Sequence, residues 1–158
     1  MDTTLKFKDT SVFIKTALIC ALGMAVYFLI MKAAGFANRV ELHFLNIFIM
    51  FWGIRYVLLR ARNDNNGRLD YLPGLTSGFL TALMTAIFFA VFIFIYFSYL
   101  DNAMLLSLQS ELSFGQYVTP GALVLMIVLE GGASGAILSF ALIHLLNREK
   151  IRRNNLAE

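Results

Sequence analysis

Four long stretches of apolar residues constrain the fold of this chain more than any other feature of its sequence. They run over about 12–34, 42–59, 74–99 and 118–146. Each is near or above the roughly 18–20 residues that a helix needs to cross the hydrocarbon core of a bilayer. Inside a bilayer only helices and closed barrels satisfy their own backbone, and these stretches lack the period-two alternation of barrel strands. We therefore predict an all-α membrane protein, a single domain over 1–158 with four transmembrane helices in an up-down-up-down bundle.

The composition supports lipid as the solvent of these helices. Hydrophobic residues make up 59% of the chain and charged residues 15%, whereas a soluble domain is about half apolar and about a quarter charged. The lone cysteine, Cys20, excludes an internal disulfide framework. The first stretch is longer than the apolar region of a signal peptide, which favours a retained anchor. Cleavage after the small residues Ala33 and Ala34 is the alternative.

The cationic residues lie mainly on one side of the predicted membrane. With the N-terminus in the cytoplasm, the inner flanks hold nine of them and the outer flanks two. The inner set is Lys6, Lys8, Arg60, Arg62, Arg68, Arg148, Lys150, Arg152 and Arg153, and the outer set is Lys32 and Arg39. Because cytoplasmic flanks of membrane proteins are enriched in Lys and Arg, we predict that both termini are cytoplasmic.

Two connecting segments differ from the apolar stretches. Apolar residues recur at helical spacing within 101–113, which predicts a short amphipathic helix on the membrane surface before the fourth crossing. These residues are Met104, Leu105, Leu108 and Leu112. The end of the chain, 147–158, is polar and basic, and we expect a cytoplasmic tail that frays.

Glu130 is the acidic residue that lies deepest in the predicted membrane. It falls about 17 Å into the fourth stretch by helix rise, and Arg55 falls about 20 Å into the second. A charge near the bilayer centre costs at least about 2.5–3.5 kcal/mol, so it usually faces protein, water or an opposite charge. We therefore predict an intramembrane charge pair between Glu130 and Arg55, with a hydrogen bond from Thr85. The pair either fixes helix packing or forms part of a proton or cation site.

Small residues recur every four positions in the third and fourth stretches, where they let helix backbones approach closely. The predicted helix-packing residues are Gly74, Gly78, Ala82, Ala86, Gly131, Gly132, Gly135 and Ala136. They pack either inside the bundle or against a second protein.

No pattern in the sequence predicts a metal, a cofactor, a catalytic centre or a nucleic-acid surface. His43 and His144 lie at opposite ends of their stretches, about a membrane apart, and no zinc or di-iron spacing occurs. Neither a Ser/His/Asp set at one depth nor a glycine-rich phosphate loop is present. The basic residues flank apolar stretches and form no stripe interleaved with aromatic residues, which disfavours nucleic acid as a partner.

Two segments resemble an uncharacterised family of bacterial four-helix inner-membrane proteins, a domain of unknown function. They are LPGLTSGFLTALMTAIFFAVFIFIYFSYLD at 72–101, with the acidic loop that follows, and VLEGGASGAILSFALIHLLNREK at 128–150. The resemblance covers roughly residues 72–150. It implies the same topology in a bacterial cytoplasmic membrane and implies no activity. The loop before the last helix is shorter here than is typical of that family.

The functional expectation is therefore a non-catalytic accessory or scaffold subunit of the membrane. It would pack against another membrane protein or against itself, as a homo-oligomer within the lipid bilayer, through the small-residue faces. The alternative is a small oligomeric channel or transporter that uses Glu130 and Arg55. A third option, an enzyme acting on lipid, is disfavoured because no polar cluster lies at either membrane interface.

Overall fold

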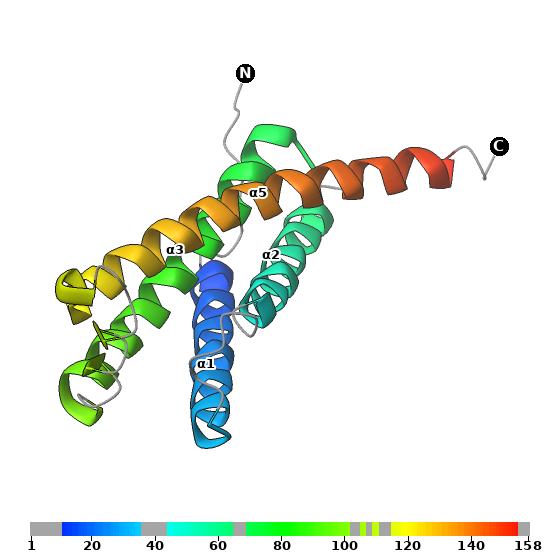
Figure 1. The fold of residues 1–158 in the computed structure, drawn as a ribbon. Coiled ribbons are helices and arrows are strands. Elements are labelled where there is room, and N and C mark those ends of the chain that lie inside the picture. The colour runs from blue at the N-terminus through cyan, green and yellow to red at the C-terminus, as the bar shows by residue number, and fades with distance from the viewer. Residues whose placement is uncertain are drawn as a thin grey trace.

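The computed structural model describes residues 11–35, 44–64, 69–101, 105–106, 109–110 and 115–154, and all regular structure in these residues is helical. The long helices are α1 (Ser11–Ala33), α2 (Phe44–Asp64), α3 (Tyr71–Ile95) and α5 (Pro120–Asn154) (Figure 1). A π-helical turn, η2 (Tyr96–Leu100), continues α3, and a 3-10 turn, η3 (Gly115–Tyr117), precedes α5.

Three of the described helical segments are long and apolar enough to cross a membrane. They are Ser11–Ala33, Tyr71–Leu100 and Pro120–Arg148. The second predicted crossing also forms a helix, α2, but this helix falls outside that group. Its sequence explains why, since charged residues interrupt the apolar run at Arg55 and again at Arg60, Arg62 and Asp64.

Two helices extend beyond the ends that their apolar stretches suggest. α2 continues from 59 to Asp64, and Arg60 and Asp64 at i and i+4 form an ion pair with an Nε–Oδ2 distance of 3.8 Å. α5 continues to Asn154 through the segment that we expected to fray from 147. That segment contains neither Gly nor Pro and is rich in Arg, which favours helix.

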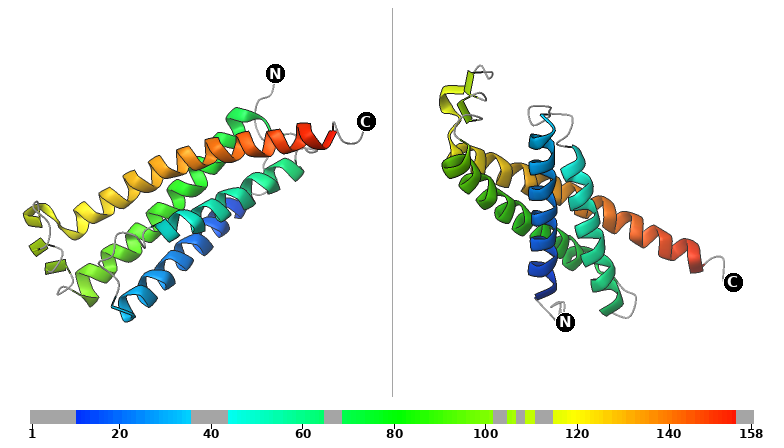
Figure 2. Two further views of the ribbon diagram at one scale, coloured as in Figure 1. Left: turned by 45° about the vertical axis from the view of Figure 1, so that its right-hand side comes forward. Right: turned by 90° about the horizontal axis from the view of Figure 1, so that it is seen from below.

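The third helix, α3, is the centre of the fold, because α1, α2 and α5 each pack more extensively against it than they pack against one another. α2 also contacts α1 and α5. In both views of Figure 2, α5 crosses the other helices obliquely and extends past them at its C-terminal end. The beginning of α1 and the end of α2 lie towards that same end of the molecule. Successive helices therefore alternate in direction, as the hydropathy pattern predicts.

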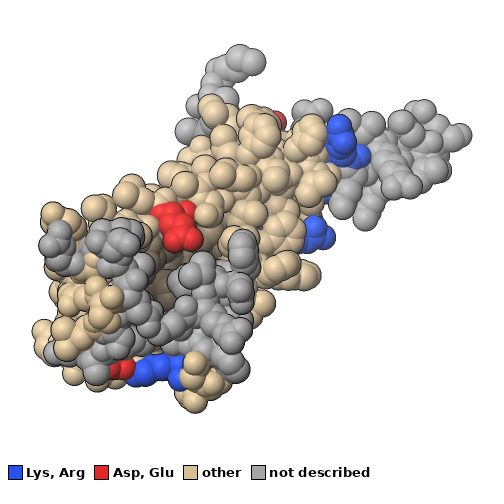
Figure 3. Space-filling model, viewed as in Figure 1, with Lys and Arg blue, Asp and Glu red and all other residues tan. Residues whose placement is uncertain are grey.

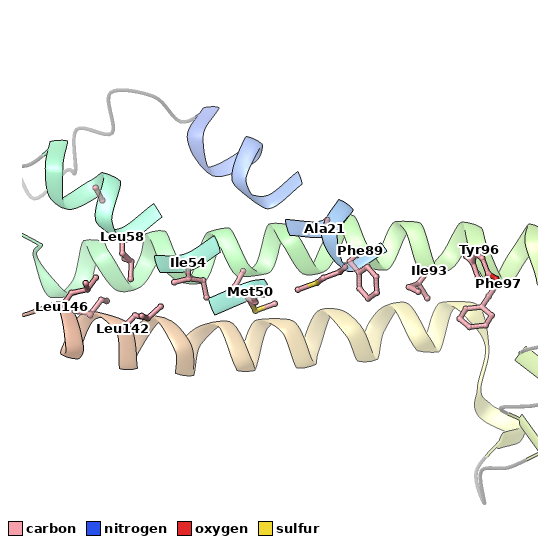
Figure 4. Packing of buried hydrophobic residues seen from close by; sticks show 14 of the residues in the cluster. Ala21, Met50, Ile54, Leu58, Phe89, Ile93, Tyr96, Phe97, Leu142 and Leu146 are labelled. Carbon is pink, nitrogen blue, oxygen red and sulfur yellow. The ribbon is translucent and has the colours of Figure 1, made fainter. Parts of the chain in front are cut away.

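The core lies where α2 and α5 converge on α3. Ile54 and Leu58 of α2 are fully buried there, together with Leu142, Ile143 and Leu146 of α5. Figure 4 shows Leu58, Leu142 and Leu146 close together at one end of this region, and Phe89, Ile93, Tyr96 and Phe97 continue the core towards the other end. Between these ends the contact of α3 with α5 consists of small residues.

The predicted surface helix over 101–113 lies partly outside the described residues, which include only 101, 105–106 and 109–110 of it. The four residues 105, 106, 109 and 110 are helical. Leu105 is buried, and the Gln109 side chain donates a hydrogen bond from Nε2 to the carbonyl oxygen of Val118 at 2.7 Å. This contact ties the segment to the residues that lead into α5.

Candidate functional site

The closest helix contact in the described structure is an antiparallel match of small residues between α3 and α5. Four pairs meet at intervals of four residues on both helices: Gly78 with Ser139, Ala82 with Gly135 and Ala86 with Gly131, which are all small, and Gly74 with the larger Ile143. A Cβ atom added to Gly135 would overlap the Cβ of Ala82, and one added to Gly131 would overlap that of Ala86. The backbones therefore approach too closely for a side chain at either glycine, as is common where small residues line membrane helices.

The two remaining predicted packing residues lie beside this contact. Gly132 and Ala136 are half-buried. A Cβ atom on Gly132 would meet Cδ1 of Leu83 at 3.7 Å, which is an ordinary van der Waals distance. Gly132 thus has room for a side chain, whereas Gly131 and Gly135 have none.

Buried hydroxyl groups in the α3–α5 contact are satisfied within their own helices. The hydroxyl of Thr85 donates to the carbonyl oxygen of Thr81 at 2.8 Å, and Thr81 donates to Ser77 in the same way. On α5, the hydroxyl of Ser139 donates to the carbonyl oxygen of Gly135 at 2.6 Å. Such bonds to the preceding turn let Ser and Thr sit in an apolar helix contact. Thr85 is therefore committed to its own helix and does not join Glu130.

Arg55 and Glu130 do not form the predicted ion pair within the molecule. In the described part of the chain, ion pairs join Lys32 to Asp101 and Arg60 to Asp64. Glu130 is exposed and Arg55 is half-buried. The reason is the orientation of α5: Gly131 faces α3, and successive helical residues differ by about 100°, so Glu130 is turned out of the contact.

Glu130 nevertheless lies at the level of the apolar centre of the molecule. It is ten residues after Pro120, which is about 15 Å along the helix. The adjacent Gly131 lies beside Ala86 of α3 and the side chain of Met50. Figure 3 shows charged side chains mainly towards the two ends of the molecule, with an acidic patch on the uncharged surface between them. The exposed carboxyl group of Glu130 is thus placed where a bilayer would surround it with acyl chains.

A second charged cluster, which we did not predict, joins the end of α1 to the end of α3. The ammonium group of Lys32 donates hydrogen bonds to the hydroxyl of Tyr96 and to Oδ2 of Asp101. It also lies 4.8 Å from the centre of the Tyr96 ring, within range of a cation–π interaction. Phe28 of α1 packs edge-on against the same ring with 5.2 Å between centroids. The cluster therefore anchors α1 to α3 at this end of the molecule.

The π-helical turn η2 explains why Tyr96 and Asp101 reach the same lysine. The backbone N–H of Asp101 donates to the carbonyl oxygen of Tyr96, five residues earlier, at 3.1 Å. In this wider turn, residues five apart lie above one another, whereas in an α-helix they would diverge. The sequence held a signal for the pair, because Lys32 and Asp101 end the first and third apolar stretches and both fall on the predicted outer side.

The described residues contain no group of three or more His, Cys, Asp or Glu side chains able to hold a metal ion. His144 is exposed on α5, and His43 lies outside the described residues. Cys20 is buried between α1 and α2, close to Gly53.

The helices and their chemistry define a multi-pass membrane protein, with three helices long and apolar enough to cross a bilayer. A family model described as a protein of unknown function, DUF4199, matches residues 15–112. The chain belongs to this family. The matched region starts in α1 and includes α2 and α3, so it extends further towards the N-terminus than the segments that carry the resemblance in the sequence. Neither the curated proteins nor the solved structures contain a significant match.

Proposed function

We propose that α2 is a fourth crossing and that both chain ends are cytoplasmic, in a bacterial inner membrane. The support is where α2 lies along its neighbours. Ile49 is near Gly23, at the middle of α1, and Met50 is near Gly131 of α5. A helix packed alongside the centres of two apolar helices shares their depth. The apolar residues before Arg55 and the basic residues at the end of α2 fit a helix that ends on the cytoplasmic side.

Within that membrane, the chain acts as a non-catalytic accessory or scaffold subunit whose α5 packs against protein. The observation that carries this proposal is the exposed carboxyl group of Glu130 in the middle of an apolar helix. Only 11% of the most apolar part of α5 is buried, against 39% for α1 and 44% for α3. Acyl chains alone would cover most of that surface at no cost, but they would not solvate a carboxylate. A protein neighbour that does so accounts for both features.

The alternative is a small oligomeric channel or transporter using Glu130 and Arg55. It needs the two side chains to share a path for an ion. They lie on different helices and are not paired in the described structure. The scaffold role requires only that a neighbour covers Glu130, so we prefer it.

Photo-crosslinking from α5 in intact membranes tests the scaffold role. A photoreactive amino acid is placed at Ile137, which is 70% exposed two turns after Glu130, and in a matched control at Leu142, which is fully buried. We expect protein adducts of increased mass from position 137. From position 142 we expect only crosslinks within the chain, to α2 or α3.

Two results would count against the proposal. If position 137 reacts with lipid alone, α5 faces the bilayer and the packing role is wrong. If vesicles containing the purified chain pass protons or cations, and Glu130→Gln abolishes that flux without loss of folding, the transport alternative replaces the scaffold role.

A further inference from the structure

We propose that α5 binds a transmembrane helix of another protein, and that a basic residue of that helix pairs with Glu130. The binding surface is the outer seam of α5, which comprises Met126, Glu130, Ala133, Ile137, Phe140 and His144. This inference rests on the proposed function, because it requires α5 to face protein. It adds the chemistry of the partner, which is a membrane-spanning helix with a Lys or Arg at the depth of Glu130.

The outer seam points away from the contact between α5 and α3. All six of its residues are exposed. Each residue turns a helix by about 100°, so Glu130 is about 140° around α5 from Gly135 and about 180° from Ser139. Both Gly135 and Ser139 are buried against α3. Glu130 therefore lies on the side of α5 that this chain leaves uncovered.

The spacing of the outer seam fits a neighbouring helix. Steps of four and three residues alternate from Met126 to His144, which keeps the six residues on one stripe over five turns. Membrane helices commonly pack along such stripes at small crossing angles. Ala133, one turn after Glu130, is small enough to let a partner backbone come close. The exposed Met126 and Ile137 supply apolar surface on either side of the carboxyl group.

Arg55 does not match the charge of Glu130, because it lies at a different depth. Within the described part of the chain Glu130 has no ion-pair partner. Arg55 directly follows Ile54, and Ile54 lies against Gly78 of α3. Gly78 in turn faces Ser139 of α5. Ser139 is nine residues after Glu130, about 13 Å along the helix.

The two lysines of α1 are equally far from this depth. Gly23 of α1 marks the depth of Glu130, because Ile49 of α2 is near Gly23 and the next residue of α2 is near the residue after Glu130. Lys15 precedes Gly23 by eight residues, and Lys32 follows it by nine. These spacings correspond to roughly 12–14 Å along α1, in opposite directions. The charge that Glu130 lacks must therefore come from outside the chain.

Charge complementarity favours a foreign helix over a second copy. A carboxylate among acyl chains is costly, and a hydrogen-bonded opposite charge offsets that cost. A second copy on a two-fold axis along the membrane normal keeps every residue at its own depth, so it would bring Glu130 to the other Glu130 or to apolar residues. Two carboxylates would repel each other. A partner helix with Lys or Arg in the middle of its apolar run supplies the missing charge.

Synthetic transmembrane helices test this partner chemistry with the full chain in phosphatidylcholine vesicles. Each probe is a run of leucines with the same polar ends and carries Arg, Leu or Glu at its central position. Binding is measured by energy transfer from a donor at the C-terminus of the chain to an acceptor on the probe. We expect the Arg probe to bind about tenfold or more tightly than the Leu probe. The Glu probe should bind no better than the Leu probe.

Further probes and variants test the depth and the surface. A probe with its Arg moved seven residues towards either end, about 10 Å, should lose its advantage over the Leu probe. Glu130→Gln keeps the size of the side chain and should abolish the preference for Arg. Ala133→Trp obstructs the outer seam and should weaken binding of the Arg probe. Ile19→Trp, at an exposed position of α1, is the matched control and should leave that binding unchanged.

Charge reversal supplies a readout that does not depend on loss of binding. Glu130→Lys should reverse the preference, so that the Glu probe binds more tightly than the Arg probe. Because Glu130 is exposed, both of its variants should keep the helical content of the wild type, which circular dichroism checks. The inference is overturned if the Arg probe binds the wild type no better than the Leu probe. It is also overturned if Glu130→Gln keeps the preference for Arg.

Failure of this inference is distinguishable from failure of the scaffold role. If position 137 crosslinks to another protein in membranes but the probes show no preference for Arg, the scaffold role stands and the basic partner is wrong. If position 137 links only to a second copy of the chain, the outer seam is a contact between copies and the basic partner is also wrong. If position 137 reacts with lipid alone, both proposals are wrong.

Discussion

Adding a single methyl group at Gly135 should force α3 and α5 apart. In the structure a Cβ atom at this position would overlap the Cβ of Ala82, and both atoms are fixed to helix backbone. No rotamer change can relieve the clash. Overpacking of this kind costs about 1–3 kcal/mol, whereas replacing a helical Gly by Ala gains about 0.5–1 kcal/mol. We expect Gly135→Ala to lower the free energy of unfolding by up to about 2 kcal/mol.

Two further variants test whether the contact between residues 135 and 82 causes the loss of stability in Gly135→Ala. Gly132→Ala, on the same helix, places its methyl group 3.7 Å from Leu83 and should be neutral or stabilising. In the double variant G135A/A82G the methyl group moves from one helix to the other. Its stability should return to near that of the wild type, because the clash is removed and the gain from the new helical alanine offsets the loss of about 1 kcal/mol from the new helical glycine. Because the two residues are in contact, their effects should not add.

Reversible unfolding in mixed micelles, followed by circular dichroism or by steric trapping, measures these differences. If Gly135→Ala is as stable as the wild type, the backbones are not as close as described. If Gly132→Ala is equally destabilising, the effect comes from α5 in general and not from the match with Ala82. If the double variant is worse than Gly135→Ala, the two positions do not face each other.

Three other predictions concern the contact between Lys32 and Asp101, the burial of Cys20 and the membrane topology. Lys32→Met and Asp101→Asn should each lower the midpoint temperature of thermal unfolding. The double variant should lower it no more than the worse single variant, because the ion pair between Lys32 and Asp101 is lost in all three. Additive losses would refute the contact. Cys20 is 7% exposed, so it should react with a thiol reagent only when the protein unfolds, and rapid labelling of the folded protein would contradict its burial. In a Cys20→Ala background, single cysteines at Asn66 and Asn38 test the predicted topology. The one at Asn66 should be shielded from a membrane-impermeant thiol reagent added outside intact cells, whereas the one at Asn38 should react. The opposite result would place both termini outside the cytoplasm.

The four long helices could be predicted from hydropathy alone, because a long apolar run leaves its backbone no partner except itself. Three of them are also long and apolar enough to span a bilayer. Their ends were less accurate where polar residues continue a helix. Arg60 and Asp64 extend α2 by pairing one turn apart, and the segment after 147 extends α5 with residues that are polar but helix-compatible. Hydropathy shows where a run of apolar residues ends. The helix itself can continue beyond that point through polar residues.

The orientation of Glu130 could not be predicted, because α5 offers two small-residue stripes. One contains Gly131 and Gly135, and the other contains Gly132 and Ala136. Either could face α3, and the choice turns α5 by about 100°. Complementarity with Ala82 and Ala86 decides for the first stripe, and that information lies on another helix. The same rotation directs Glu130 out of the core and separates it from Thr85.

The unbroken course of α5 has a mechanical consequence. From Glu130 to Asn154 the helix runs 24 residues without a break, about 36 Å, and it continues past the ends of its neighbours. A straight rod of this kind converts a small tilt at its middle into a larger sweep of its tip. A tilt applied to α5 at the level of Glu130 would therefore move the C-terminal end of the helix through a larger distance.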